Sequence, residues 1–118
     1  MALFLAMTGA PAAASGLTGT WTLSVDLENG EHGEPALVIQ QSNDQLSGAY
    51  RGPFGKQKVT GSVQGDTVML EVAASGLGRT LRLSYTGHIE ASDRISGTMI
   101  RNISGTRTAG KWTATRDK

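Results

Sequence analysis

The sequence predicts an all-β domain, namely an eight-stranded antiparallel up-and-down β-barrel, and three observations support this. Apolar and polar residues alternate in eight short segments, glycine is abundant at 16 residues, and only 5% of the chain is aromatic. Alternation with a period of two indicates strands that bury one face. A sheet closed on itself buries a single face and leaves no free edge, which suits a chain with so few aromatic residues.

The expected strands follow one another at short, even intervals, as in a meander. In residues 20–27, one face carries Trp21, Leu23, Val25 and Leu27. The other strands are expected near residues 36–41, 46–52, 58–64, 67–73, 80–87, 94–101 and 110–116. A chain of 118 residues fits one domain, which we place at residues 16–118.

A pentapeptide recurs in these segments: an apolar residue, Ser or Thr, Gly, any residue, and a second apolar residue. Its glycines are Gly19, Gly48, Gly61, Gly87 and Gly97. Each lies two residues from inward apolar residues and therefore faces inward itself. An inward glycine permits the sharp coiling that closes a small barrel. Compositional bias in a chain rich in Gly, Thr and Ser is the alternative, but the fixed apolar flanks favour the barrel interpretation.

Residues 1–15 differ from the rest and have the composition of the end of a secretory signal peptide. Leu3 to Met7 form a short apolar run, and Ala12-Ala13-Ala14 offers a cleavage site before Ser15. The run is too short to span a bilayer, so no membrane span is expected. We therefore expect a secreted or periplasmic protein with a truncated signal peptide; a disordered tail is the alternative.

Composition and charge narrow the functions that the chain can have. A net charge of +1 gives no electrostatic case for nucleic acid, and the absence of cysteine excludes disulfides and thiolate metal sites. His32 lies in an acidic loop that favours a solvated hairpin over a cation site. Neither His32 nor His88 lies near an inward nucleophile, so the sequence predicts no enzyme, no cofactor and no metal.

One end of the barrel is predicted to be open because the connections there look longer. The connections near residues 42–44, 65–66 and 91–93 are ordinary tight turns, whereas residues 28–35, 52–55, 74–79 and 102–109 form longer ones. The acidic loop 28–35 and the basic segment from Arg101 to Arg107 both lie at this mouth. A rim salt bridge is the favoured interpretation of that juxtaposition, and a polar gate or an anion-seeking rim is the alternative.

A funnel at this mouth is the predicted ligand site, with an apolar wall and a few polar groups. Phe54 could fold over the opening. An equally favoured alternative is that the same residues simply fill the barrel. The predicted ligand-binding residues are Val25, Leu27, Leu37, Tyr50, Phe54, Val72, Leu81, Met99, Arg101 and Trp112.

Both ends of the chain resemble calycins, the group that holds lipocalins, fatty-acid-binding proteins and avidins. Gly19-Thr20-Trp21 resembles their G-x-W start, and Trp112-Thr113-Ala114-Thr115-Arg116 resembles the W-x-A-T-R ending of avidin-type chains. The resemblance implies a secreted bacterial barrel in which Gly19, Trp21 and Arg116 close one end. Strand polarity independently brings Arg116 beside Trp21, because the last strand pairs antiparallel with the first.

The biotin chemistry of avidins does not carry over to this chain. Leu23 and Leu27 stand where avidins have a polar pair, and only Tyr50 matches the biotin-binding set. A small apolar or amphipathic molecule is therefore the predicted ligand. A protein-interaction barrel, similar to the calycin-type protease inhibitors of bacteria, and a filled structural barrel without a ligand are the alternatives.

Overall fold

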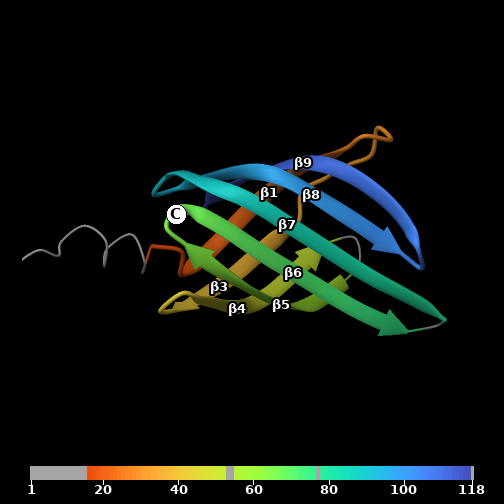
Figure 1. Cartoon of the computed structure of the whole chain (residues 1–118), viewed down its shortest axis with the longest axis horizontal. Coiled ribbons are helices and arrows are strands. Elements are labelled where there is room, and N and C mark those ends of the chain that lie inside the picture. The colour runs from red at the N-terminus through yellow and green to blue at the C-terminus, as the bar shows by residue number, and fades with distance from the viewer. Residues whose placement is uncertain (1–15, 53–54, 77, 118) are drawn as a thin grey trace, which may run out of the picture.

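The computed structural model describes residues 16–52, 55–76 and 78–117, which form a closed antiparallel β-barrel (Figure 1). Each barrel strand pairs with the next, and the last pairs with the first. The strands are β1 (Gly19–Leu27), β3 (Ala36–Ser42), β4 (Gln45–Gly52), β5 (Gly55–Gln64), β6 (Thr67–Gly76), β7 (Arg79–Ala91), β8 (Arg94–Ile103) and β9 (Thr106–Arg116). The predicted eight-stranded up-and-down barrel is confirmed. Within the described residues, no helix is long and apolar enough to cross a membrane.

A ninth, two-residue strand, β2 (His32–Gly33), supplements the barrel. It pairs with the end of β1 on the side where β3 pairs with the start of β1. Pro35 lies between β2 and β3, and because proline has no N–H to donate, the ladder is interrupted there. The Pro35 carbonyl still accepts a hydrogen bond of 2.8 Å from the Leu23 amide. The segment that leads into β3 is thus held against the barrel wall at the mouth.

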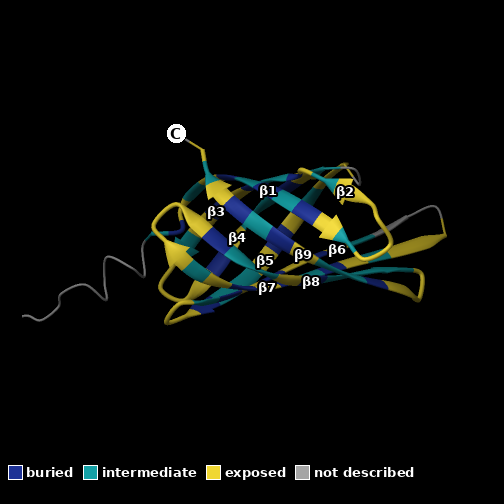
Figure 2. Cartoon of the chain, turned by 90° about the horizontal axis from the view of Figure 1, so that it is seen from above, coloured by how far each residue is buried: buried dark blue, intermediate teal, exposed yellow. Residues whose placement is uncertain are grey.

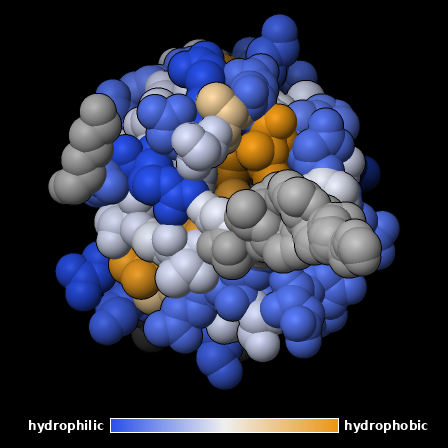
Figure 3. All heavy atoms as spheres, turned by 90° about the vertical axis from the view of Figure 1, so that its left-hand side faces the viewer, coloured by the Kyte–Doolittle hydropathy of each residue, from blue (hydrophilic) through white to orange (hydrophobic). Residues whose placement is uncertain are grey.

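The barrel closes along the seam between β1 and β9, where Trp21 pairs with Arg116 and Leu27 pairs with Gly110. The Arg116 guanidinium lies 4.4 Å from the centroid of the Trp21 ring. It also donates hydrogen bonds to the carbonyls of Thr18 and Ser92. This is the arrangement expected from strand polarity. Figure 3 looks onto this closed end, which is mostly hydrophilic with an apolar area near its centre.

Inward glycines bring neighbouring backbones into close contact. A Cβ added at Gly48 would lie 1.7 Å from the Val38 carbonyl oxygen, and one added at Gly97 would lie 1.9 Å from that of Thr86. No side chain fits such a space. The recurring pentapeptide therefore marks positions where adjacent strands coil tightly against each other, as closure of a small barrel requires.

The connections at the mouth are shorter than the sequence suggests. Only loop 28–35 is long: β5 begins at Gly55 soon after β4 ends at Gly52, β7 begins at Arg79 soon after β6 ends at Gly76, and β9 begins at Thr106 soon after β8 ends at Ile103. Ser104 and Gly105 both have positive φ values, 49° and 94°, as in a two-residue hairpin turn that matches strand twist. The mouth is elaborated by hairpins that extend beyond the rest of the barrel, as Figures 1 and 2 show.

Buried and exposed residues alternate along the strands, and the buried ones converge inside the barrel (Figure 2). Packing is close toward the closed end, where the free space is only about 10 Å³. That part is filled by Leu17, Trp21, Leu37, Ile39, Leu46, Val68, Leu70, Ile95, Trp112 and Ala114. The filled-barrel alternative thus describes the closed half. The expected signal peptide (residues 1–15) lies outside the described residues.

Candidate ligand site at the open end

The open half of the barrel contains a cavity of about 330 Å³. This volume lies at the lower end of the range for small-molecule sites, which are mostly apolar with a few convergent polar groups. The wall comes from β1, β4, β7 and β8, and the mouth loop, residues 28–35, forms the remaining side. The lining residues are Val25, Leu27, Glu31, His32, Gly33, Pro35, Tyr50, Leu83, Tyr85, Met99, Arg101 and Ile103.

Two phenols supply the deeper polar groups of the cavity. Tyr50 on β4 and Tyr85 on β7 are almost completely buried, yet neither hydroxyl has a hydrogen-bond partner among the described residues. Among the described residues, no side-chain nitrogen or oxygen is both fully buried and without a hydrogen-bond partner. The two tyrosine hydroxyls are therefore accessible from the cavity. Burial raises the pKa of Tyr50 to about 12 and also raises the pKa of Tyr85. Both groups therefore stay protonated at neutral pH and can donate a hydrogen bond to a ligand.

Tyr85 is positioned by Trp112, which lies below it. The two rings meet edge to face, with centroids 5.3 Å apart. The Trp112 indole N–H donates to the backbone carbonyls of Thr86 and Thr98, at 3.2 and 2.9 Å. These bonds fix the indole to the wall, so that the floor of the cavity is rigid. Trp112 thus supports the site without lining it.

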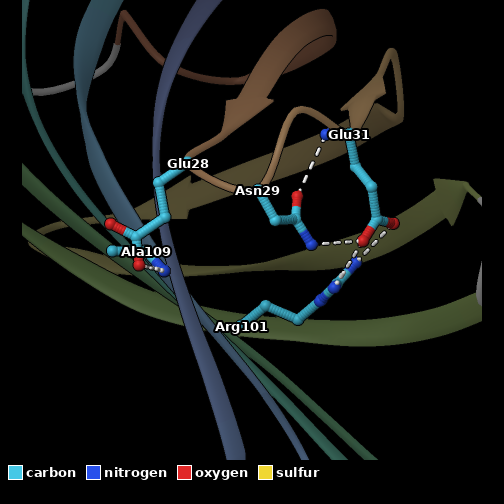
Figure 4. Close-up of polar contacts among 5 residues, drawn as sticks. All are labelled: Glu28, Asn29, Glu31, Arg101 and Ala109. Atoms are coloured by element: carbon cyan, nitrogen blue, oxygen red, sulfur yellow. Dashed lines mark hydrogen bonds and ion pairs between the residues drawn. The ribbon is translucent and has the colours of Figure 1, made fainter.

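An ion pair attaches the mouth loop to the barrel wall (Figure 4). Both terminal nitrogens of Arg101 on β8 donate to the Glu31 carboxylate, at 3.1 and 3.0 Å. Asn29 also donates to this carboxylate. The Arg101 guanidinium and the Asn29 amide lower the pKa of Glu31 to about 2. A bidentate pair of this kind fixes geometry as well as charge. The rim salt bridge expected from the sequence is present between these two residues.

His32 makes a second set of contacts in the same loop. Its Nδ1 lies 2.7 Å from an Asp26 carboxylate oxygen, and its Nε2 lies 3.1 Å from one of Glu34. The hydrogen bonds to Asp26 and Glu34 raise the pKa of His32. The imidazolium form bridges β1 to the loop, and deprotonation removes a donor from one of the two contacts.

The pH dependence of folding stability follows from this shift. A histidine whose pKa is raised by folding stabilises the protein below its unfolded pKa, and this contribution is lost as the pH rises through the folded pKa. His32→Gln should therefore cost stability at about pH 5 and cost less at about pH 8. Glu31, with a pKa of about 2, stays ionised throughout. Urea unfolding across this pH range measures the effect, and His88→Gln is the matched control. If the cost of His32→Gln does not vary with pH, the predicted role of the His32 charge is contradicted.

The structure brings together half of the residues predicted for the site. Val25, Leu27, Tyr50, Met99 and Arg101 line the cavity. Leu37 and Trp112 lie in the filled half, and Val72 is fully buried in the wall. Leu81 borders a separate hollow with Ala74, Arg82 and Asn102. Phe54 lies outside the described residues. Val72 and Trp112 lie on strands that continue farther toward the mouth than predicted, so both residues are farther from the rim than expected. The strands of Leu37 and Leu81 begin close to their predicted starts, so strand length does not account for the positions of these two residues.

Several lining residues were not predicted: Glu31, His32, Gly33, Pro35, Leu83, Tyr85 and Ile103. Tyr85 and Leu83 carry a usable signal, since alternation with Leu81 along the predicted strand 80–87 puts both on its inward face. How far along each strand the cavity extends depends on the stagger of the barrel, and alternation does not encode it. The loop residues carried no signal for their position over the opening.

Among the described residues, no group of three or more His, Cys, Asp or Glu side chains is arranged to hold a metal ion. His32, Asp26 and Glu34 satisfy one another at the outer edge of the loop. What the site offers chemically is an apolar wall, two phenol donors, and one guanidinium already paired with a carboxylate.

No protein-family model matches the chain, and no curated protein matches it. Solved structures with the same fold include EF1p2_mFAP2b bound to DFHBI, with a TM-score of 0.69 and 15% identity over 92% of this chain and 100% of that one. The redesigned β-barrel mFAP1 bound to DFHBI has a TM-score of 0.64 and 21% identity over 88% and 98%. A phycobiliprotein lyase from Guillardia theta has a TM-score of 0.50 and 11% identity over 95% and 94%. The chain therefore shares the closed antiparallel barrel fold of these proteins, and the resemblance to calycins stays a prediction.

Proposed function

We propose that the protein binds one small amphipathic molecule in the cavity at the open end, and that its function is binding without catalysis. The apolar body of the ligand contacts Val25, Leu83 and Met99. An acceptor group on the ligand receives hydrogen bonds from the hydroxyls of Tyr50 and Tyr85. The end of the ligand nearest the rim lies against Arg101 and the mouth loop.

The observation that carries this proposal is the contrast between the two halves of one barrel. The closed half is packed, with about 10 Å³ of free space, whereas the open half holds about 330 Å³. Empty apolar space costs stability because its lining loses dispersion contacts. Polar donors without partners add a further cost when they are removed from bulk water. A ligand that fills the space and accepts from the phenols offsets both costs.

The structural neighbours support a small-molecule ligand without identifying it. EF1p2_mFAP2b and mFAP1 hold DFHBI, and another barrel of this fold is described as fluorescence-activating. At these levels of sequence identity, the neighbours share only the fold with this chain. The ligand class proposed for this chain therefore rests on its own cavity residues.

Titration with a panel of small amphipathic compounds, with DFHBI as the first probe, tests the proposal. Binding should change the fluorescence of Trp112, because its ring contacts Tyr85 at the cavity floor. Tyr85→Phe removes one donor and should weaken binding of the best compound by about three-fold to ten-fold, the worth of one hydrogen bond. If the phenols orient the ligand, Tyr50→Phe should have an effect of the same order.

Arg101→Gln tests the contribution of the rim. The variant removes the guanidinium that faces the cavity and breaks its ion pair with Glu31. A ligand with an anionic end should therefore lose about ten-fold in affinity. Arg107→Gln, the same change on exposed β9 outside the cavity, is the matched control and should leave affinity unchanged. Equal effects of the two variants on the dissociation constant would show that only overall charge matters.

The composition of residues 1–15 further supports a proposal that the protein is secreted or periplasmic. In that case the exported protein should begin near Ser15, which N-terminal sequencing measures. Exported protein that retains Met1 would contradict it.

A further inference from the structure

Charged residues are unevenly distributed along the barrel axis. The tight turns at the closed end carry Asp44, Asp66 and Asp93, while the cations there are Arg94, which is paired with Glu90, and Arg116, which lies over Trp21. The three hairpins that form the open end carry exposed cations: Arg51, Lys56 and Lys58 on β4 and β5, Arg79 and Arg82 at the start of β7, and Arg107 at the start of β9. The two ends can be followed in Figure 2, with the open end on the right. The barrel therefore has an electrostatic polarity that its net charge of +1 conceals.

The cations of the β4–β5 hairpin form a basic cluster, which consists of Arg51, Lys56 and Lys58. Arg51 lies directly opposite Lys56 in the strand register, and Lys58 lies two residues farther along the same outer face. Like charges directly opposite each other on neighbouring strands destabilise a sheet. Among the described residues, no carboxylate forms an ion pair with any of the three. The folded barrel by itself therefore gains nothing from this cluster.

Most carboxylates of the open half are already engaged by cations of the barrel itself; Glu28 accepts a hydrogen bond from the Ala109 amide. Glu31 is paired with Arg101, and Glu71 is paired with Arg82 at 3.4 Å. Asp26 and Glu34 both contact His32. The basic cluster, together with Arg79 and Arg107, is thus left for an anion outside the molecule.

We propose that the open end docks on an anionic lipid surface, with the basic cluster against the headgroup phosphates and Arg79 and Arg107 approaching from the other two hairpins. The cations are spread over separate hairpins around the mouth, and an extended surface can meet them together, whereas a polynucleotide needs a continuous stripe or groove. The choice of lipid rests on the proposed function, because an amphipathic ligand partitions into membranes and docking would bring the mouth to it.

Sedimentation with vesicles tests the docking on ligand-free protein, so its outcome is independent of the ligand titration. The protein should bind vesicles of phosphatidylcholine with phosphatidylserine at low salt, and should not bind pure phosphatidylcholine. High salt should release it, because the attraction is screened. Each basic residue near such a surface contributes about five-fold in affinity, so the triple variant Arg51→Gln, Lys56→Gln, Lys58→Gln should bind about 100-fold more weakly.

Two matched comparisons separate docking at the mouth from a general effect of charge. Arg51→Gln and Arg94→Gln make the same change at opposite ends, and only Arg51→Gln should weaken vesicle binding. The triple variant should unfold at the same or a higher urea concentration than the original, because it removes like-charge repulsion. Equal effects of Arg51→Gln and Arg94→Gln, or no binding to phosphatidylserine vesicles at low salt, would overturn the proposal.

The orientation on the vesicle gives a second, independent readout. The chain has no cysteine, so a single introduced cysteine can carry an environment-sensitive fluorophore. Thr106→Cys places the fluorophore at the open end, and Gln45→Cys places it at the closed end; both positions are exposed. Phosphatidylserine vesicles should change the emission of the Thr106→Cys conjugate only. A response confined to the Gln45→Cys conjugate, or equal responses from both, would contradict docking through the mouth.

Discussion

Replacing Trp21 by alanine should lower the free energy of unfolding by about 3–5 kcal/mol. The ring is 1% exposed and fills the closed end of the barrel. Its indole N–H donates to the Leu17 carbonyl at 3.0 Å, and its face supports the Arg116 guanidinium. Truncation leaves a cavity in a part of the barrel that has almost no other free space, and the seam between β1 and β9 limits how far the wall can collapse. Urea unfolding followed by circular dichroism measures the loss.

Two further variants isolate the stacking of Arg116 on Trp21. Arg116→Gln removes the cation–π contact, which is worth about 0.5–2 kcal/mol, and also loses bonds to the carbonyls of Thr18 and Ser92. A double-mutant cycle with Trp21→Ala separates the two effects, because those carbonyl bonds do not involve the indole ring. A coupling energy near zero would show that the guanidinium contributes to closure only through the carbonyls. A cost below about 1 kcal/mol for Trp21→Ala would contradict its role as the plug.

Gly97→Ala should destabilise the barrel by about 3 kcal/mol, the upper end of the usual cost of overpacking. The new methyl group would lie 1.9 Å from the Thr86 carbonyl oxygen and 2.5 Å from the Gly87 Cα. Both atoms are backbone, so no change of rotamer relieves the clash, and β7 and β8 would have to separate. Thermal or urea unfolding measures the change.

Gly65→Asn is the control for Gly97→Ala. Gly65 lies in the β5–β6 turn with a φ of 60° and has no atom within 4 Å of an added Cβ. Asparagine adopts this backbone conformation more readily than other non-glycine residues, so the loss should be well below that of Gly97→Ala. Similar losses of stability in the two variants would contradict this explanation. They would indicate that the flexibility of glycine, and not the close approach of β7 and β8, determines the cost.

The sequence was sufficient to predict the strands and their closure because both depend on local patterns. Alternation identified all eight barrel strands, and the pentapeptide identified four glycines at which neighbouring backbones meet, Gly48, Gly61, Gly87 and Gly97. Strand ends were harder to predict, since Ser104-Gly105 and Gly78 allow hairpins to continue where polar residues suggested loops. The longer hairpin of β8 and β9 places Trp112 in the filled half.

The site could be predicted only in part, for a different physical reason. Val25, Tyr50 and Met99 were found because inward positions near strand ends are readable from alternation. The mouth loop approaches the opening through long-range contacts, above all the pair between Glu31 and Arg101, which lie 70 residues apart. Charge in both segments suggested a rim salt bridge, but no local pattern indicates which carboxylate reaches Arg101.

Methionine methyl NMR tests the central claim, that the open half of the barrel is a ligand site, most directly. Met99 lines the cavity, whereas Met69 is 55% exposed on the outer wall, so the chain contains both a probe and its control. Titration with the best compound from the fluorescence panel should shift the Met99 methyl resonance in a saturable way and leave that of Met69 unchanged. If no compound in a broad amphipathic panel shifts Met99, or if Met69 shifts equally, the cavity is not a ligand site.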